Sequence, residues 1–261
     1  MIEARILSKR FGALMAVEDV SFSIEPGTVV GFLGPNGAGK STTLRLLTGY
    51  LAPDGGTARI CGYDITADRR RAQACLGYLP EAATGFPHLT VREFLSFCGE
   101  SRGLRRKSLG AAIEQTCARI ELGPALDRQM RILSKGWRQR AWLAQAILLD
   151  PPVLILDEPT DGLDPNQKDR VRALIRSIAP EKAIILSTHI LEEIEEICDR
   201  VFMIAGGRII ADDTPGNLAD ANGRLGSAFR RLTGARHPKA RAWGDRLGGR
   251  TWNIGYWEHP R

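Results

Sequence analysis

One stretch of the sequence combines glycines, a lysine and a serine at a spacing that suits phosphate chemistry. Residues 34–41 read Gly-Pro-Asn-Gly-Ala-Gly-Lys-Ser and fit G-x-x-x-x-G-K-[ST], the phosphate-binding loop called Walker A. Glycine has no Cβ and tolerates positive φ, so backbone N–H groups can curl around phosphate oxygens. Lys40 would place its charge on the β- and γ-phosphates, and Ser41 would ligate Mg²⁺. A Gly-rich turn with a chance lysine is the alternative, which the complete motif disfavours. The predicted nucleotide contacts are Gly34, Pro35, Asn36, Gly37, Ala38, Gly39, Lys40, Ser41 and Thr42.

Two carboxylates and a histidine follow apolar runs further along the chain. Asp157 and Glu158 come after the run 153–156, and His189 comes shortly after the run 183–186. Asp157 would hold Mg²⁺ through its water shell, and Glu158 would act as general base toward the water that attacks a γ-phosphate. His189 is either an ordinary surface histidine or a residue that contacts the γ-phosphate and orients water. The phosphate loop upstream argues against a pair of merely solvated acids.

These residues need strands and helices that hold them. The run 28–33 predicts a buried strand and the run 41–47 a helix, so the phosphate loop lies where a strand turns into a helix. The run 153–156 predicts a buried parallel strand that carries the acids at its carboxyl end, which is where ligands bind in open α/β sheets. Residues 183–186 predict another such strand, and the fold class is therefore α/β.

The first part of the chain predicts mostly strands. Residues 1–26 alternate apolar and polar side chains with the period of a half-buried strand. Phe11 lies on a turn there, and it is either a platform for adenine or a core residue. Asp54-Gly55-Gly56 predicts the tight turn of a hairpin-like pair. Residues 76–79 predict a strand that ends at Pro80 and leaves Glu81 on a loop, either near a metal or water or simply solvated.

A helical segment interrupts this pattern. From about residue 90 to 130, apolar residues recur at helical spacing and no strand is indicated, so a helical subdomain inserted into an α/β core is predicted. A buried helix follows over 141–149. Ser134 can cap that helix, and Ser134 and Gly136 together would either present O–H and N–H donors to an anion or form a plain N-cap.

Composition narrows the classes of function. The chain has 261 residues, a formal net charge of +6 and five scattered cysteines, which predict neither a disulfide framework nor a zinc site. No apolar run reaches the ~20 residues that span a bilayer, and no signal-like segment follows Met1. The basic residues form no single stripe, so a solvated surface is favoured over a nucleic-acid or membrane interface.

Seven motifs in order make the chain resemble the nucleotide-binding subunit of ATP-binding cassette (ABC) transporters, from about residue 2 to about residue 218. They are the adenine-stacking aromatic at Phe11, Walker A at 34–41, the Q-loop at Glu81, the signature motif at 133–139, Walker B at 153–158, the D-loop at Leu163-Asp164 and the switch histidine at His189. The resemblance implies an ABC ATPase domain over 1–218: a P-loop NTPase core with a parallel sheet, an N-terminal antiparallel β subdomain and a helical subdomain inserted at about 90–145.

The resemblance also implies partners. In this family two ATP-binding subunits face each other head to tail, so Ser134, Lys135 and Gly136 would act in trans on the ATP bound by the partner. ATP binding closes the dimer and hydrolysis reopens it, as a ligand-driven population shift. The implied protein is a homodimer, or a heterodimer with a second ATP-binding subunit. It would be cytoplasmic, peripheral on the cytoplasmic face of the cell membrane, and bound to a membrane-spanning permease, with no nucleic-acid partner.

The implied cofactors are ATP and Mg²⁺. Ser41, Asp157 and Glu81 would lie at the metal, and Glu158 and His189 would be the catalytic pair. Glu81 departs from the usual glutamine, because a carboxylate accepts hydrogen bonds but cannot donate them.

Further features resemble an exporter-type branch, that of gliding-motility, drug-resistance and sodium-extrusion ATPases. The signature reads Leu-Ser-Lys-Gly-Trp-Arg-Gln, and residues 228–234 are similar to that branch's C-terminal phrase. Residues 219–261 are expected to form a partly disordered extension, whose basic, Trp-containing end would otherwise be an interfacial membrane contact.

Two other functions fit the sequence less well. A soluble ABC ATPase acting on ribosomes or DNA usually carries two cassettes or a long coiled-coil insertion, and this chain has neither. A small P-loop GTPase predicts an Asn-Lys-x-Asp motif, which is not found, and leaves the signature and His189 unexplained.

Overall fold

The strands of the protein form two sheets. The computed structural model describes residues 1–82, 84–220 and 224–234. An antiparallel sheet with the order β2-β1-β4-β5 contains β1 (Ile2–Phe11), β2 (Leu14–Ile24), β4 (Gly55–Ile60) and β5 (Tyr63–Asp64). The main sheet has the order β10-β9-β3-β8-β7-β6 and contains β3 (Thr28–Leu33), β6 (Leu76–Leu79), β7 (Val153–Asp157), β8 (Ala183–Thr188), β9 (Arg200–Ala205) and β10 (Arg208–Asp213).

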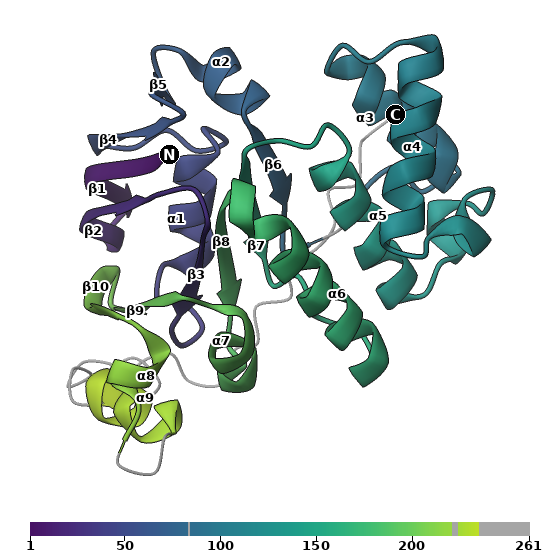
Figure 1. Cartoon of the computed structure of the whole chain (residues 1–261). Helices are drawn as coiled ribbons and strands as arrows, with labels where there is room; N and C mark the ends of the chain where they lie inside the picture. Colours follow the sequence, from purple (N-terminus) through teal and green to yellow (C-terminus); the bar gives the residue numbers. More distant parts are fainter. Residues whose placement is uncertain (83, 221–223, 235–261) are drawn as a thin grey trace, which may run out of the picture.

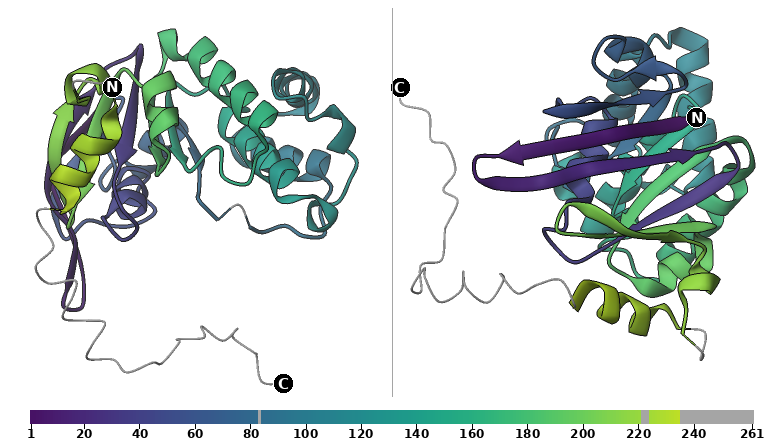
Figure 2. Two further views of the ribbon diagram at one scale, coloured as in Figure 1. Left: turned by 90° about the horizontal axis from the view of Figure 1, so that it is seen from below. Right: turned by 90° about the vertical axis from the view of Figure 1, so that its left-hand side faces the viewer.

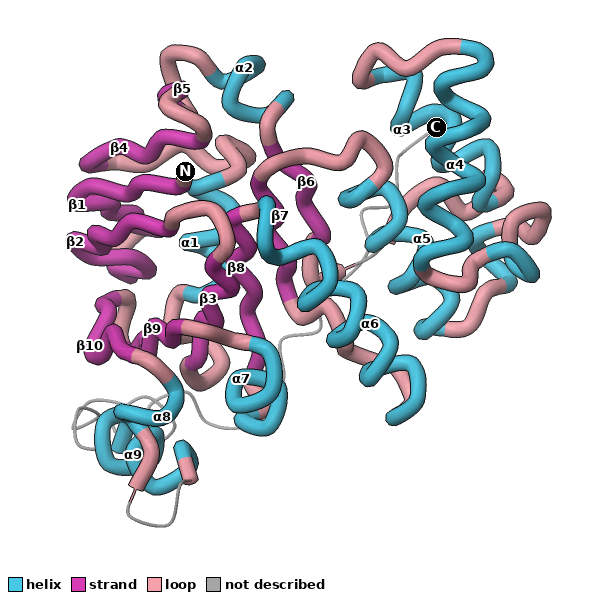
Figure 3. Tube along the Cα trace, in the orientation of Figure 1, coloured by secondary structure: helices cyan, strands magenta, loops and turns pink. Residues whose placement is uncertain are grey.

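Helices flank the main sheet on both sides (Figures 1 and 3). The helices of the described residues are α1 (Lys40–Leu47), α2 (Arg69–Ala74), α3 (Val91–Ser101), α4 (Arg106–Arg119), α5 (Lys135–Ile147), α6 (Pro165–Ile178), α7 (Leu191–Ile197), α8 (Pro215–Leu218) and α9 (Leu225–Gly234). Short 3₁₀ turns lie at Gly123–Ala125, Met130–Ile132 and Ala179–Glu181. Figure 2 shows β1 and β2 as a long purple pair on the opposite side of the molecule from α3, α4 and α5.

The main sheet is buried on both faces, which explains its continuous apolar strands. Strands β3, β6, β7, β8 and β9 run parallel, and only β10 pairs antiparallel, with β9. Along β3, Val29 and Leu33 face the core shared with α6 and α7, whereas Val30 and Phe32 face the core shared with α1 and the antiparallel sheet. Phe32 contacts Phe22 of β2 with ring centroids 5.7 Å apart, which joins the two sheets. Packing on both faces of the main sheet therefore fixes the ends of its parallel strands.

Local signals in the sequence define the inserted helices. Thr90 and Glu93 form a capping box at the start of α3, and Ser134 caps α5 by accepting a hydrogen bond from the N–H of Trp137. The apolar faces of these helices join the same core as β7 and α6. The predicted fold class is confirmed, including the N-terminal antiparallel sheet and the inserted helical subdomain. Among the described residues, no helix is both long and apolar enough to span a membrane.

The hairpin predicted at Asp54-Gly55-Gly56 is wrong. These residues lead into β4, which pairs with β1, and the tight turn lies instead at Cys61-Gly62 between β4 and β5. A Cβ on Gly56, where φ is +71°, would lie 2.1 Å from the carbonyl oxygen of Ile6. This glycine is therefore required because the backbone of β1 approaches closely, rather than because the chain reverses.

Candidate active site

The phosphate loop connects the end of β3 to the start of α1, as predicted. Gly39 is the N-cap of α1 with φ of 107°, and no side chain caps the helix. The first N–H groups of α1 and the positive end of its dipole therefore point toward the loop. A Cβ on Gly34 would lie 2.4 Å from the carbonyl oxygen of Ile204, so the loop has no room for a side chain there. This arrangement suits an anion of the size of a phosphate.

Lys40 reaches back across this loop. Its Nζ donates to the carbonyl oxygen of Gly34 at 2.6 Å and to that of Pro35 at 3.3 Å. The residue is only 7% exposed. Burial lowers the pKa of the Lys40 ammonium, while the nearby carboxylates of Glu158 and Asp157 oppose that shift. The lysine thus sits within a group of acids with its charge directed at the loop that would hold phosphates.

Asp157 lies at the carboxyl end of β7 with two hydroxyl groups. Its Oδ1 accepts hydrogen bonds from Ser187 Oγ at 2.5 Å and from Ser41 Oγ at 3.2 Å, and Ser41 Oγ is also 3.5 Å from Glu81 Oε2. Asp157 is fully buried, and its Oδ2 has no hydrogen-bond partner in the described protein. Burial raises the pKa of this carboxyl group. A buried carboxylate oxygen without a partner is where a metal ion or its bound water fits.

Among the described residues, protein side chains alone do not form a complete metal site around Asp157. The described part of the chain contains no group of three or more His, Cys, Asp or Glu side chains that could hold a metal. The donors present are a hydroxyl and one or two carboxylates, which matches Mg²⁺ sites completed by phosphate and water.

The structure brings Glu158 and His189 into contact. Nδ1 of His189 lies 3.0 Å from Oε2 and 3.1 Å from Oε1 of Glu158. Burial raises the pKa of Glu158, and the hydrogen bond to His189 opposes this shift. The carboxylate side chain is 12% exposed, so it can meet a water molecule while it keeps the basicity that burial provides.

A pocket of about 360 Å³ lies between the phosphate loop and the Glu158–His189 pair. It is lined by Gly34, Pro35, Asn36, Glu81, Glu158, Asp161, His189 and Phe229. Asp161 and Phe229 are not among the site residues predicted from the sequence. Phe229 lies on α9, within a run of apolar residues at helical spacing (225, 228, 229 and 232) that predicts a helix but not its proximity to the phosphate loop. The predicted extension from residue 219 thus contributes to the site through α9, and residues 235–261 lie outside the described part.

The other predicted site residues lie elsewhere. Ser134 and Lys135 are exposed at the start of α5, where Lys135 Nζ contacts Asp161 Oδ2 at 2.7 Å. Gly136 is buried, and a Cβ there would lie 2.7 Å from Gln167 Oε1. Phe11 is the last residue of β1 and is 48% exposed. None of these four described residues lines the pocket.

The fold and the site together define a P-loop NTPase. The phosphate loop follows β3, a central parallel strand. Asp157 and Glu158 lie at the carboxyl end of β7, which is separated from β3 by β8 in the sheet. Residues 17–161 match the ABC transporter family, and the chain belongs to this family. It is an ATP-binding and ATP-hydrolysing subunit that powers transport.

Similar proteins agree with this assignment. The Nod factor export ATP-binding protein I of Burkholderia lata is 38% identical over 221 residues, which cover 84% of this chain and 73% of that protein. The protein of the same name from Paraburkholderia xenovorans is 41% identical over 218 residues, which cover 83% and 72%. A solved ATP-binding subunit of an ABC transporter superposes with a TM-score of 0.81 at 30% identity and covers 89% of this chain and 99% of its own. A dimeric bacterial ABC transporter cassette has the same fold, with a TM-score of 0.77 at 20% identity over 82% of this chain and 98% of its own.

Proposed function

We propose that this chain powers export through a separate membrane-spanning permease, and that Glu158 is the general base of its ATPase reaction. The observation that carries the proposal is the contact of Glu158 with His189 in the pocket beside the phosphate loop. The names of the related proteins support export as the direction of transport. They also argue against the soluble ATPase that acts on ribosomes or DNA.

The nucleotide would be held by the loop and by the start of α1. Residues 34–42 would contact the phosphates mainly through backbone N–H groups, which all of them except Pro35 have. Lys40 would exchange its bonds to Gly34 and Pro35 for phosphate oxygens. Ser41, Asp157 and Glu81 would hold Mg²⁺, which neutralises charge on the β- and γ-phosphates when it is bound. We retain Phe11 as the adenine platform, because its ring is exposed and an aromatic face suits a base.

Glu158 would take a proton from the attacking water. Burial of its carboxylate raises its pKa, and a base whose pKa approaches the working pH takes up a proton readily. His189 would hold the carboxylate in one orientation and present its ring to the γ-phosphate side of the pocket. General base catalysis of this kind contributes about 10²–10⁴-fold to rate.

The signature residues would serve a second subunit. Ser134 and Lys135 are exposed, and neither lines the pocket of its own chain, which supports action in trans in a dimer. One structural neighbour was solved as a dimer, and we propose a head-to-tail dimer for this chain, with either a second copy or a related subunit.

A groove between the core and the helical subdomain would receive the permease. It has a volume of about 630 Å³, and its walls include Arg45 and Tyr50 from the core and Arg102 and Trp142 from the helical subdomain. Tyr50 is 74% exposed, although it is a large aromatic residue. An amphipathic segment of the permease would cover these side chains, and it would place the chain at the cytoplasmic face of the membrane.

The substitution Glu158→Gln tests this proposal. It keeps the shape of the side chain and removes the base, so we expect ATP binding to persist and the hydrolysis rate to fall by about 10²–10⁴-fold. Size-exclusion chromatography with ATP should then show a stable dimer. Glu192→Gln, at an exposed position of α7, is the matched control and should behave as wild type. Wild-type turnover by Glu158→Gln would rule out Glu158 as the base, and a monomer with ATP would rule out the dimer.

A further inference from the structure

The main chain of the proposed base adopts an unusual conformation. Glu158 has a φ of +52°, in the left-handed region that residues with a Cβ seldom occupy. Such a conformation persists only when the surrounding structure holds it, and it often accompanies functional sites. The direction of the Glu158 side chain therefore depends on the groups that fix its peptide units.

Groups of β8, of α5 and of the loop that follows Glu158 fix them. The N–H of Glu158 donates to Oγ and to the carbonyl oxygen of Ser187 on β8, at 3.1 and 3.2 Å. The carbonyl oxygen of Glu158 accepts from the N–H of Asp161 at 3.2 Å and from Nε2 of Gln139 at 3.0 Å. Gln139 is 3% exposed, and it reaches this carbonyl from α5. Gln139 thus connects the helical subdomain to the backbone of Glu158.

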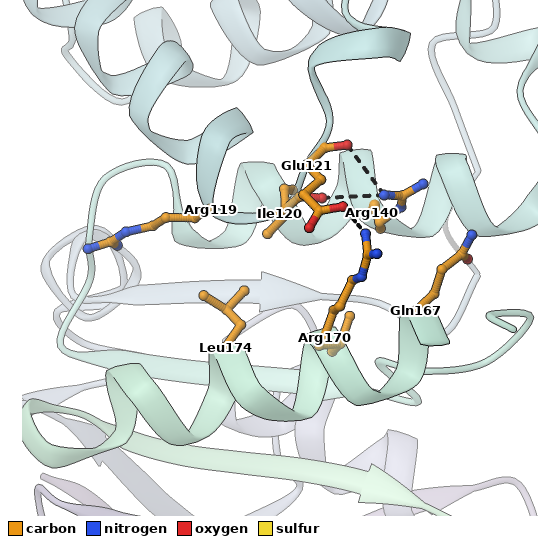
Figure 4. Close-up of a pocket in the computed structure, with 8 residues that line it drawn as sticks. Arg119, Ile120, Glu121, Arg140, Gln167, Arg170 and Leu174 are labelled. Atoms are coloured by element: carbon orange, nitrogen blue, oxygen red, sulfur yellow. Dashed lines mark hydrogen bonds and ion pairs between the residues drawn. The ribbon is translucent and has the colours of Figure 1, made fainter. Parts of the chain in front are cut away.

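The next residue on α5 faces the helical subdomain instead. The Arg140 guanidinium donates through one nitrogen to the carbonyl oxygens of Ile120 and Glu121, each at 3.4 Å, and it lies 3.8 Å from the centroid of the Trp137 ring. Figure 4 shows Arg140 beside Ile120 and Glu121, the two residues that follow α4, while Glu121 is paired with Arg170 of α6. Neighbouring residues of α5 therefore bind the end of α4 and the backbone of Glu158.

Helix α5 begins at the signature segment. Its N-cap, Ser134, is exposed, and Gln139 lies little more than one helical turn away. A helix transmits a displacement of its first turn to its second turn because its backbone hydrogen bonds keep the two in register. Movement of Ser134 would therefore displace the side-chain amide of Gln139.

We propose that Gln139 is a positioning residue that links the nucleotide site completed by Ser134 to the chain's own base, Glu158. This inference rests on the proposed head-to-tail dimer. ATP bound by the partner draws the start of α5 toward it, and Gln139 then adjusts the carbonyl of Glu158 and hence the direction of the carboxylate against His189. ATP binding at one site thereby changes the orientation of the base at the other site. Hydrolysis at the two sites is therefore coupled.

The test uses the full chain with Gln139→Met, which keeps the length of the side chain and removes the donor. We expect kcat for ATP to fall about tenfold or more, as loss of a buried hydrogen bond at a positioned base implies. KM for ATP should stay within about twofold, because Gln139 contacts no phosphate-loop residue. The Hill coefficient for ATP should fall toward one. Thr116→Val, at a buried polar position of α4, is the control and should keep both the wild-type kcat and the wild-type Hill coefficient.

Other outcomes overturn the inference. A folded Gln139→Met chain with wild-type kcat and cooperativity would exclude any positioning role, and a reduced kcat with unchanged cooperativity would exclude the link between the two sites. If Gln139→Met does not fold, Gln139→Leu also removes the amide donor with a shorter apolar side chain, and it should give the same loss. Dimer formation by Glu158→Gln is measured separately, so failure of the proposed dimer is distinguished from failure of this inference.

Discussion

Two glycines of the phosphate loop should respond very differently to the same substitution. Gly37 and Gly39 both have positive φ, 77° and 107°. A Cβ on Gly37 would meet nothing within 4 Å, whereas a Cβ on Gly39 would lie 2.4 Å from the carbonyl oxygen of Ala16 and 3.4 Å from Cα of Gly207. Gly37→Ala therefore introduces backbone strain alone, and Gly39→Ala introduces strain and a collision with β2.

The expected magnitudes follow from these contacts. A positive φ costs an alanine roughly 1–2 kcal/mol, and if the free loop relaxes, ATP must restore the strained shape. Gly37→Ala should then weaken ATP binding about 5- to 30-fold. At Gly39 the loop must also move away from the Ala16 carbonyl, which misplaces its N–H donors. Hydrogen bonds to charged groups contribute about 1.5–3 kcal/mol each, so losing two of them weakens binding by a further factor of at least about 100.

Isothermal titration calorimetry with ATP would measure this difference. Gly110→Ala is the matched control, because Gly110 lies in α4 with open space around its Cβ position and negative φ, and its ATP affinity should equal that of wild type. Thermal unfolding would confirm that all three variants are folded. Equal ATP affinities for Gly37→Ala and Gly39→Ala would refute the steric reasoning, because the contact with Ala16 is what separates them.

Other substitutions test the remaining site residues. Lys40→Ala should weaken ATP binding by about 10- to 100-fold and abolish turnover at ordinary ATP concentrations, since it removes the charge beside the loop; a normal ATPase rate would contradict the site. Glu81→Gln should retain ATPase activity within about twofold, because Glu81 is exposed and the amide is usual in the family; an inactive enzyme would show a specific role for the carboxylate. Burial raises the pKa of Glu158, and a base acts only when deprotonated. We therefore expect kcat to fall as pH decreases through a range above that of a solvated glutamate, and an acid limb at the ordinary glutamate pKa would be evidence against burial of the base.

The sequence predicted the parts of the site that depend on neighbouring residues. The glycine spacing of residues 34–41, the strand before it and the helix after it all lie within one short segment, and the structure has the same elements. The acids at the end of β7 were predicted for the same reason, because an apolar run followed by two carboxylates is a local pattern. Parallel strands then bring these ends to one edge of the sheet.

Contacts between distant segments could not be predicted in this way. Gly56 suggested a turn, but it is needed because β1 passes close to it. Ser187 looks like an ordinary hydroxyl at a strand end, yet it donates to Asp157 and accepts from Glu158. Phe229 reaches the pocket only because α9 packs against α7 and β9. No local periodicity encodes such pairings, since each depends on how whole elements are placed.

Glu158, the proposed base, has two energetically unfavourable features, and both serve catalysis. Glu158 has a left-handed backbone and a buried carboxylate, and each would be avoided in a residue that served only stability. The strained backbone directs the side chain at His189, while burial raises the pKa that makes the carboxylate a useful base. Both features depend on contacts from β8, α5 and the segment around Asp161, so a change in any of these should alter the rate of hydrolysis before it alters nucleotide binding. Because α5 contributes Trp142 and Gln145 to the proposed permease groove, movement of the permease can act on hydrolysis through the position of Glu158.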